Sequence, residues 1–95
     1  MFNNIEISEL KKIIGRVNII DIRDNYIFKM GNIPTSKNIP MNFITTNPGE
    51  YLNNSITYYI YCEQGIRSVQ VCKKLSSLGY KVINIIGGYQ LYIKN

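Results

Sequence analysis

The residues best suited to do chemistry form one short segment, in which Cys62 is followed by Gly65, Arg67 and Ser68. A strand is expected to end at Cys62 and a helix to begin near Arg67, so the N–H groups of the loop can converge on the sulfur and favour its thiolate. Gly65 allows the loop to curl with a positive φ, and the hydroxyl of Ser68 can support the turn or the helix start. Arg67 adds a permanent cation for an anionic substrate or for the carboxylate of Glu63. The pattern predicts a cradle for a small anion with a nucleophilic sulfur at its base.

The rest of the loop and two earlier charged residues complete the candidate site. Glu63, Gln64 and Ile66 belong to the substrate-binding loop. We expect Glu63 and Gln64 to face solvent, where they would influence the choice of donor or partner. Asp21 and Arg23 lie at the C-terminal end of another expected strand. We interpret them as an ion pair that braces the loop rather than as catalytic groups.

The second cysteine has a different interpretation. Cys72 falls on the apolar face of the helix expected after the loop, one turn from Leu75, so it is interpreted as core packing rather than as a partner of Cys62. Two cysteines at this spacing form neither a disulfide framework nor a CxxC motif.

Residue types that are absent narrow the chemistry further. The chain contains no His, Trp or Ala. Without His it cannot build a Ser-His-Asp triad, a Cys-His dyad or an HExxH zinc site. Catalysis would have to rest on cysteine, carboxylates, tyrosine, lysine, arginine and backbone dipoles.

The hydrophobic pattern predicts strands and helices that alternate along the chain. We expect strands at residues 17–22, 37–40, 56–61 and 81–86, and helices at 8–14 with Ser8 as the N-cap, 24–30, 67–78 and after Gly88, with an irregular or briefly helical connection at 41–55. This alternation predicts the α/β class, with a mainly parallel sheet and helices on both faces. Ligands bind such sheets at the carboxyl ends of the strands, which is where Cys62 is expected.

Composition limits the partners and the location. Ninety-five residues with 45% hydrophobic content predict a single domain, residues 1–95. The net charge of +5 is scattered rather than clustered, so we expect no nucleic-acid partner. No apolar run could span a membrane and the first residues do not resemble a signal peptide, so we expect a cytoplasmic protein. The excess of Ile, Asn, Lys and Tyr indicates an AT-rich genome, and we expect a bacterial source.

Four segments together resemble one known family. The loop Cys62-x-x-Gly65-x-Arg67-Ser68 resembles the active-site loop of the rhodanese-like sulfurtransferases. Three more motifs resemble those of the family and occur in the same order along the chain. They are Ile19-Ile20-Asp21-Ile22-Arg23, then Gly31-Asn32-Ile33-Pro34 with Asn38-Ile39-Pro40, then Leu78-Gly79-Tyr80-Lys81-Val82 with Ile85-Ile86-Gly87-Gly88 and Tyr92. The sequence departs from the family where Asn32 replaces His, Thr35-Ser36 replaces Gly-Ala and Tyr92 replaces Trp.

The resemblance implies a three-layer rhodanese-like fold with about five strands, and a sulfurtransferase. Cys62 would take a sulfane sulfur from thiosulfate or another small anionic persulfide donor, and pass it to cyanide, a thiol or an acceptor protein. No metal or organic cofactor is implied.

Two alternatives stay open. One is a persulfide carrier between proteins with little activity on thiosulfate. The other is a phosphatase or arsenate reductase that depends on cysteine. Only four residues separate Cys62 from Arg67, whereas the related phosphatases and arsenate reductases have a loop one residue longer. The resemblance therefore disfavours this second alternative. A phosphatase would also need a general acid, for which Glu63 is the only carboxylate in the loop.

Overall fold

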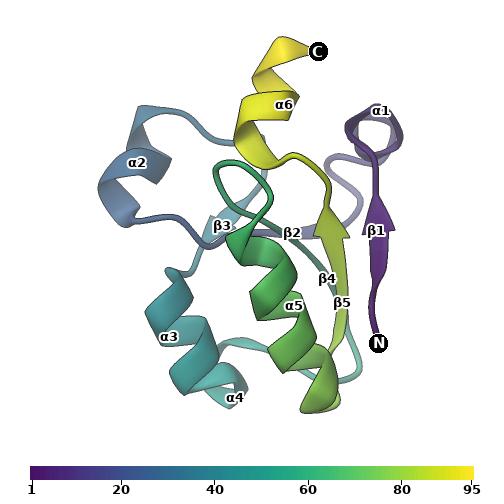
Figure 1. Ribbon diagram of the computed structural model, residues 1–95, viewed down its shortest axis with the longest axis vertical. Coiled ribbons are helices and arrows are strands. Elements are labelled where there is room, and N and C mark those ends of the chain that lie inside the picture. Colours follow the sequence, from purple (N-terminus) through teal and green to yellow (C-terminus); the bar gives the residue numbers. More distant parts are fainter.

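The computed structural model describes residues 1–95 and has the expected alternation of strands and helices (Figure 1). The elements are β1 (Asn3–Ile5), α1 (Ile7–Leu10), β2 (Asn18–Asp21), α2 (Asn25–Met30), β3 (Lys37–Asn38), α3 (Met41–Thr46), α4 (Pro48–Tyr51), β4 (Thr57–Tyr61), α5 (Arg67–Ser77), β5 (Lys81–Ile85) and α6 (Gly88–Lys94).

The five strands form one sheet in the order β1-β5-β4-β2-β3. Every pairing in it is parallel, so the expectation of a mainly parallel sheet is confirmed and made stricter. Ile19 and Ile20 of β2 and Ile60 and Tyr61 of β4 are buried, and these β-branched or aromatic side chains suit strands that are covered on both faces.

Two hydrophobic clusters cover the two faces of the sheet and make three layers. One cluster joins β2, β4 and β5 to α3 and α5, whose buried side chains include Ile44, Val71 and Leu75. The other joins the opposite face to α1, with Ile7 and Leu10, and to the partly buried tyrosines of α6. The expected helices on both faces of an α/β sheet are therefore confirmed.

Two local expectations are corrected. The helix expected at 8–14 with Ser8 as its N-cap begins at Ile7 after an N-cap at Glu6, and its regular part ends at Leu10. This start buries both Ile7 and Leu10, at 2% and 0% exposure, whereas Ser8 stays exposed within the first turn. The sequence pattern also does not predict β1, because its polar Asn3-Asn4 pair becomes a strand only by pairing with β5.

None of the helices is both long enough and apolar enough to span a membrane. The cytoplasmic location stays a prediction.

Candidate active site

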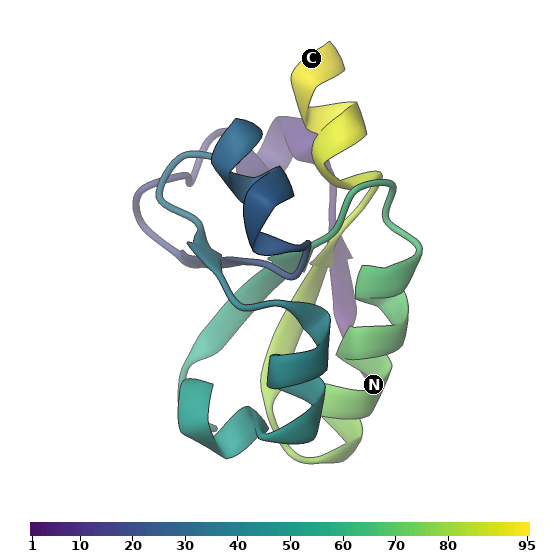
Figure 2. The ribbon, with the colours of Figure 1, turned by 90° about the vertical axis from the view of Figure 1, so that its left-hand side faces the viewer.

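Cys62 lies directly after the last residue of β4, at the carboxyl edge of the sheet. Since β4 is flanked by β5 and β2, this position is near the middle of that edge. The loop from Cys62 to Ile66 then leads into α5, and both ribbon views show it beside the start of α6 (Figures 1 and 2). The fold thus brings the loop to the place where parallel α/β sheets bind ligands.

The sulfur of Cys62 is surrounded by hydrogen-bonding groups of its own loop. The backbone N–H groups of Gly65 and Ser68 both donate to Sγ, each with an N···S distance of 3.2 Å. The thiol contacts the hydroxyl oxygen of Ser68 at 3.4 Å. Two N–H donors and the N-terminus of an 11-residue helix can stabilise negative charge on this sulfur.

Gly65 gives the loop the curl that brings these N–H groups inward. Its φ is +86°, in the left-handed region that favours glycine, and a Cβ there would lie 2.8 Å from the backbone nitrogen of Gly87. The expected positive φ at this position is therefore confirmed.

The first turn of α6 closes the back of the loop. The N–H of Tyr89 donates to the carbonyl of Cys62 at 2.9 Å, and that of Gln90 to the carbonyl of Glu63 at 3.0 Å. Gly88 makes this approach possible, because a Cβ on it would overlap the carbonyl oxygen of Cys62. The loop is thus fixed by a segment that follows it by more than twenty residues.

Arg23 is fully engaged by its surroundings. Its guanidinium pairs with Asp21 at 2.6 Å and with Glu63 at 2.9 Å, and it also donates to the carbonyl of Gly31 at 2.7 Å. Burial works to lower the pKa of Arg23, but the hydrogen bonds with the two carboxylates outweigh it and raise that pKa. The expected ion pair between Asp21 and Arg23 is present, and it contacts the loop through Glu63. Any part of the pair in catalysis stays a prediction.

The expectation that Glu63 faces solvent holds only in part, because two side chains also hold its carboxylate. Its side chain is 40% exposed, accepts from Arg23 and accepts a second hydrogen bond from Gln90. The Gln90 bond lowers the pKa of Glu63 below its usual 4.5, partial burial opposes this, and Arg23 lowers it further. Gln64 is exposed as expected.

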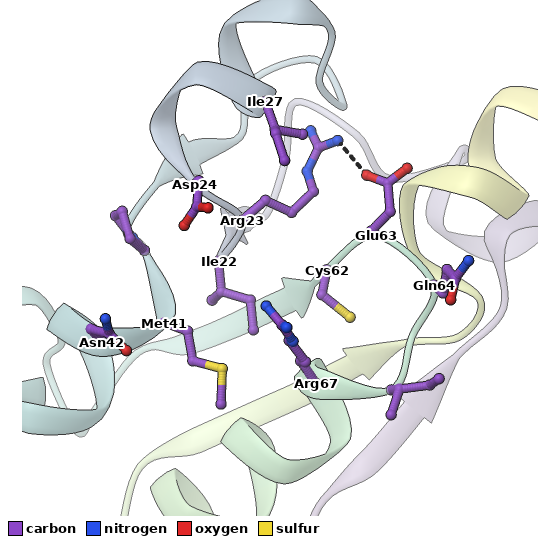
Figure 3. A pocket seen from close by; sticks show the side chains of 12 residues that line it. Ile22, Arg23, Asp24, Ile27, Met41, Asn42, Cys62, Glu63, Gln64 and Arg67 are labelled. Carbon is purple, nitrogen blue, oxygen red and sulfur yellow. Dashed lines mark hydrogen bonds and ion pairs between the residues drawn. The ribbon is translucent and has the colours of Figure 1, made fainter.

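A pocket of about 490 Å³ opens in front of the sulfur (Figure 3). Its lining combines charged and apolar side chains: Ile22, Arg23, Asp24, Ile27, Pro40, Met41, Asn42, Cys62, Glu63, Gln64, Ile66 and Arg67. Arg67 points into this space in Figure 3 and takes part in none of the molecule's ion pairs. Of the two outcomes considered for Arg67, pairing with Glu63 is therefore excluded, because Arg23 holds that carboxylate.

Several residues of the candidate site are not predicted by the sequence pattern. Asp24, Ile27 and Met41 line the pocket, but nothing in the local sequence marks them, since they reach it from the start of α2, from α2 itself and from the start of α3. Asn84 was also missed, although a polar residue inside the apolar strand β5 is a signal that could have been used. Its side chain accepts a hydrogen bond from the Ser68 hydroxyl at 2.6 Å, and that hydroxyl caps no helix.

Cys72 packs in the core, as expected. It has 0% exposure within the cluster between the sheet and α5. Burial, with a smaller effect of the neighbouring Cys62, raises the pKa of the Cys72 thiol to about 12. It is therefore protonated and shielded near neutral pH.

Comparison of this chain with known proteins identifies the family to which its fold and loop belong. The model of the family described as "Rhodanese-like domain" matches residues 6–95. The chain belongs to the rhodanese-like domain family.

Individual relatives agree with this assignment. A Bacillus subtilis protein named "Putative sulfurtransferase YtwF" is 36% identical over 70 residues, which cover 74% of this chain and 67% of that protein. A crystal structure of a Staphylococcus saprophyticus protein shares 39% identity with a TM-score of 0.88, covering 96% of this chain and 93% of that one. The rhodanese-like domain protein of Staphylococcus aureus shares 34% identity with a TM-score of 0.86, covering 96% and 91%.

This rhodanese-like domain departs from the family pattern at positions outside the pocket. Asn32 donates to the carbonyl of Phe28 at 3.0 Å, near the end of α2. The ring of Tyr92 stacks on that of Tyr89, with centroids 6.0 Å apart. Thr35 adopts a φ of +68° in the turn before β3. These residues support local structure, and none lines the pocket.

Proposed function

We propose that this rhodanese-like domain is a sulfurtransferase that carries a sulfane sulfur on Cys62, with thiosulfate or another anionic persulfide as donor. Family membership and the relative named as a sulfurtransferase support the general activity. The single observation that carries the finer proposal is the setting of the Cys62 sulfur. It accepts hydrogen bonds from two backbone N–H groups and faces a pocket that contains an arginine without a carboxylate partner.

The proposed transfer has two halves. The thiolate of Cys62 attacks the outer sulfur of thiosulfate, a new S–S bond forms, and the old S–S bond breaks with its electron pair leaving on sulfite. Arg67 binds the anionic donor, while the N–H groups of Gly65 and Ser68 stabilise negative charge at the sulfur of the enzyme. A thiophile then attacks the outer sulfur of the persulfide, and the Cys62 thiolate leaves. Cyanide would yield thiocyanate, and a thiol would yield a new persulfide.

A second candidate is sulfur exchange with a persulfide on an organic or protein carrier. The pocket offers more room than a small inorganic anion fills, and five of its twelve lining residues are hydrophobic. Ile66, on the loop itself, is 65% exposed. An apolar wall beside the sulfur suits the body of a larger donor or acceptor.

The third alternative, a phosphatase, has less support. Glu63 was the only loop carboxylate available as a general acid, and its lowered pKa keeps it ionised at neutral pH. Its two carboxylate oxygens also accept hydrogen bonds from Arg23 and Gln90, which disfavours a role as a proton donor.

The deciding experiment is the mass of the intact protein after brief exposure to thiosulfate. We expect a gain of one sulfur atom that cyanide removes. The gain should be absent in Cys62→Ser and present in Cys72→Ala, a control that removes the buried thiol. A gain only from an organic persulfide would favour the carrier, and no gain from either donor would refute sulfur transfer.

A further inference from the structure

A chain of polar side chains connects the sulfur of Cys62 with the edge of the sheet. The thiol donates to Ser68 Oγ at 3.4 Å, and the Ser68 hydroxyl donates to Asn84 Oδ1 at 2.6 Å. Asn84 in turn donates through Nδ2 to Asn4 Oδ1 at 2.9 Å. Ser68 and Asn84 are buried, at 0% and 2% exposure, whereas Asn4 is exposed on the edge strand β1. These three bonds link the reactive group to the surface.

The sheet register creates this link. Asn4 and Asn84 are direct partners in the parallel pairing of β1 with β5. Side chains alternate along a strand, so Asn84 shares a face with Val82, which packs in the cluster under α5. An amide at such a place is costly unless its hydrogen bonds are made, and no buried polar side-chain atom of the molecule lacks a partner. Ser68 and Asn4 are the two partners that satisfy Asn84.

In these three side-chain bonds each donor points away from the sulfur, toward Asn4. A thiolate has no proton to donate, so it would benefit from the Ser68 hydroxyl turning toward it. Rotation of that hydroxyl alone would leave Asn84 Oδ1 buried without a donor. An amide presents an acceptor and a donor, which exchange places on a half-turn about its last bond. After half-turns of both amides, Asn4 donates to Asn84, Asn84 donates to Ser68 and Ser68 donates to the sulfur.

We propose that Asn84 and Asn4 are positioning residues, which reverse the hydrogen-bond chain so that the Ser68 hydroxyl stabilises the thiolate of Cys62. The inference rests on the proposed function in one respect, namely that Cys62 is the reactive sulfur. The reversal breaks no covalent bond and leaves each of the three hydrogen bonds in place with its donor and acceptor exchanged.

The test uses Asn4→Asp, a substitution of similar shape at an exposed position. A carboxylate only accepts, so it holds Asn84 Nδ2 toward residue 4 and Oδ1 toward Ser68, and the hydroxyl stays turned away from the sulfur. We expect alkylation of Cys62 by iodoacetamide to become about three- to tenfold slower at neutral pH, with its pH profile shifted upward. Intact mass follows the reaction, and the buried Cys72 should not contribute.

Other charged or titratable groups near the sulfur do not change in this comparison. They are Arg67 and Cys72 of α5, Glu63 of the loop, and Arg23 and Asp24 between β2 and α2.

Two comparisons separate the chain from a simple charge effect. Asn3→Asp adds the same charge one residue earlier on the opposite face of β1, and it should leave the alkylation rate unchanged. In a Ser68→Ala background the hydroxyl is missing, so Asn4→Asp should have no further effect. Equal slowing with and without the Ser68 hydroxyl, or equal slowing by Asn3→Asp, would overturn the proposal. No slowing by Asn4→Asp in a folded protein would overturn it as well.

Alkylation and sulfur transfer fail independently. If Asn4→Asp slows alkylation but the wild-type protein gains no sulfur from any donor, the hydrogen-bond chain stands and the proposed function is wrong. If sulfur is gained and alkylation is unaffected, the proposed function stands and the chain is wrong.

Discussion

Two arginines of the pocket differ in how free they are to bind a substrate. Arg23 is buried, with 7% exposure, and its guanidinium is shared between Asp21, Glu63 and a backbone carbonyl. The ring of Tyr89 lies against it at 4.4 Å from the guanidinium carbon. Arg67 is exposed and has no carboxylate partner. At the scale of single residues, only Arg67 has its charge available for a donor anion.

Replacement of Arg67 should therefore affect substrate binding more than folding. We expect Arg67→Ala to raise the KM for thiosulfate about tenfold, because a charge-assisted contact with the anion is lost, while Arg67→Lys keeps most of the affinity. Steady-state kinetics with cyanide as acceptor measures this. Arg16→Ala removes another exposed charge, one that does not line the pocket, and serves as the control. An unchanged KM in Arg67→Ala would exclude its part in binding the donor.

Glu63 predicts a pH-dependent contribution to stability. Because its pKa is lower in the folded protein than the usual 4.5, its carboxylate adds stability above that pH and loses it as the pH falls below. We expect Glu63→Gln to lower the Tm by about 3 °C at pH 7, a modest effect for a partly exposed ion pair, and by less at pH 4. Thermal melts at several pH values test this, with the exposed Glu50→Gln as control. A difference that stays constant with pH would contradict the assigned cause.

At the scale of secondary structure, the loop depends on its contact with the first turn of α6. The backbone of Gly88 lies where any side chain would overlap the Cys62 carbonyl, and its φ of +62° is left-handed. The two N–H groups that follow hold the carbonyls of Cys62 and Glu63. The loop geometry is thus produced jointly by β4, α5 and α6.

Substitution at this contact should damage both stability and activity. We expect Gly88→Ala to lower the Tm by about 5 °C or more and to reduce sulfur transfer, because the added Cβ pushes α6 away from the loop. Gly79→Ala is a matched control, since Gly79 also has a positive φ but meets no atom within 4 Å of an added Cβ. Equal loss of activity in both variants would show that backbone strain, rather than the contact with the loop, is responsible.

At the scale of the whole molecule, the order of the strands decides which residues meet. The sequence order places Asn4 eighty residues before Asn84, yet the sheet makes them direct neighbours. β5, which follows β4 through α5, pairs on one side of β4, and β2 pairs on its other side. The loop after β4 therefore lies near the middle of the carboxyl edge. The pocket is thus assembled from the segments that follow β2, β3 and β4, including the first residues of α3 and α5.

The local sequence determined the loop, the main strands and helices, and the family. Hydrophobic periodicity, the glycine at position 65 and the order of four motifs are all properties of neighbouring residues, so they can be recognised without a structure. The tertiary structure decided which groups pair across long separations. In it Glu63 pairs with Arg23 and accepts a hydrogen bond from Gln90. The Asn3–Ile5 segment becomes a strand by pairing with β5, and Asn84 accepts a hydrogen bond from Ser68. Such pairings depend on strand order and register, and these emerge only when the whole sheet forms.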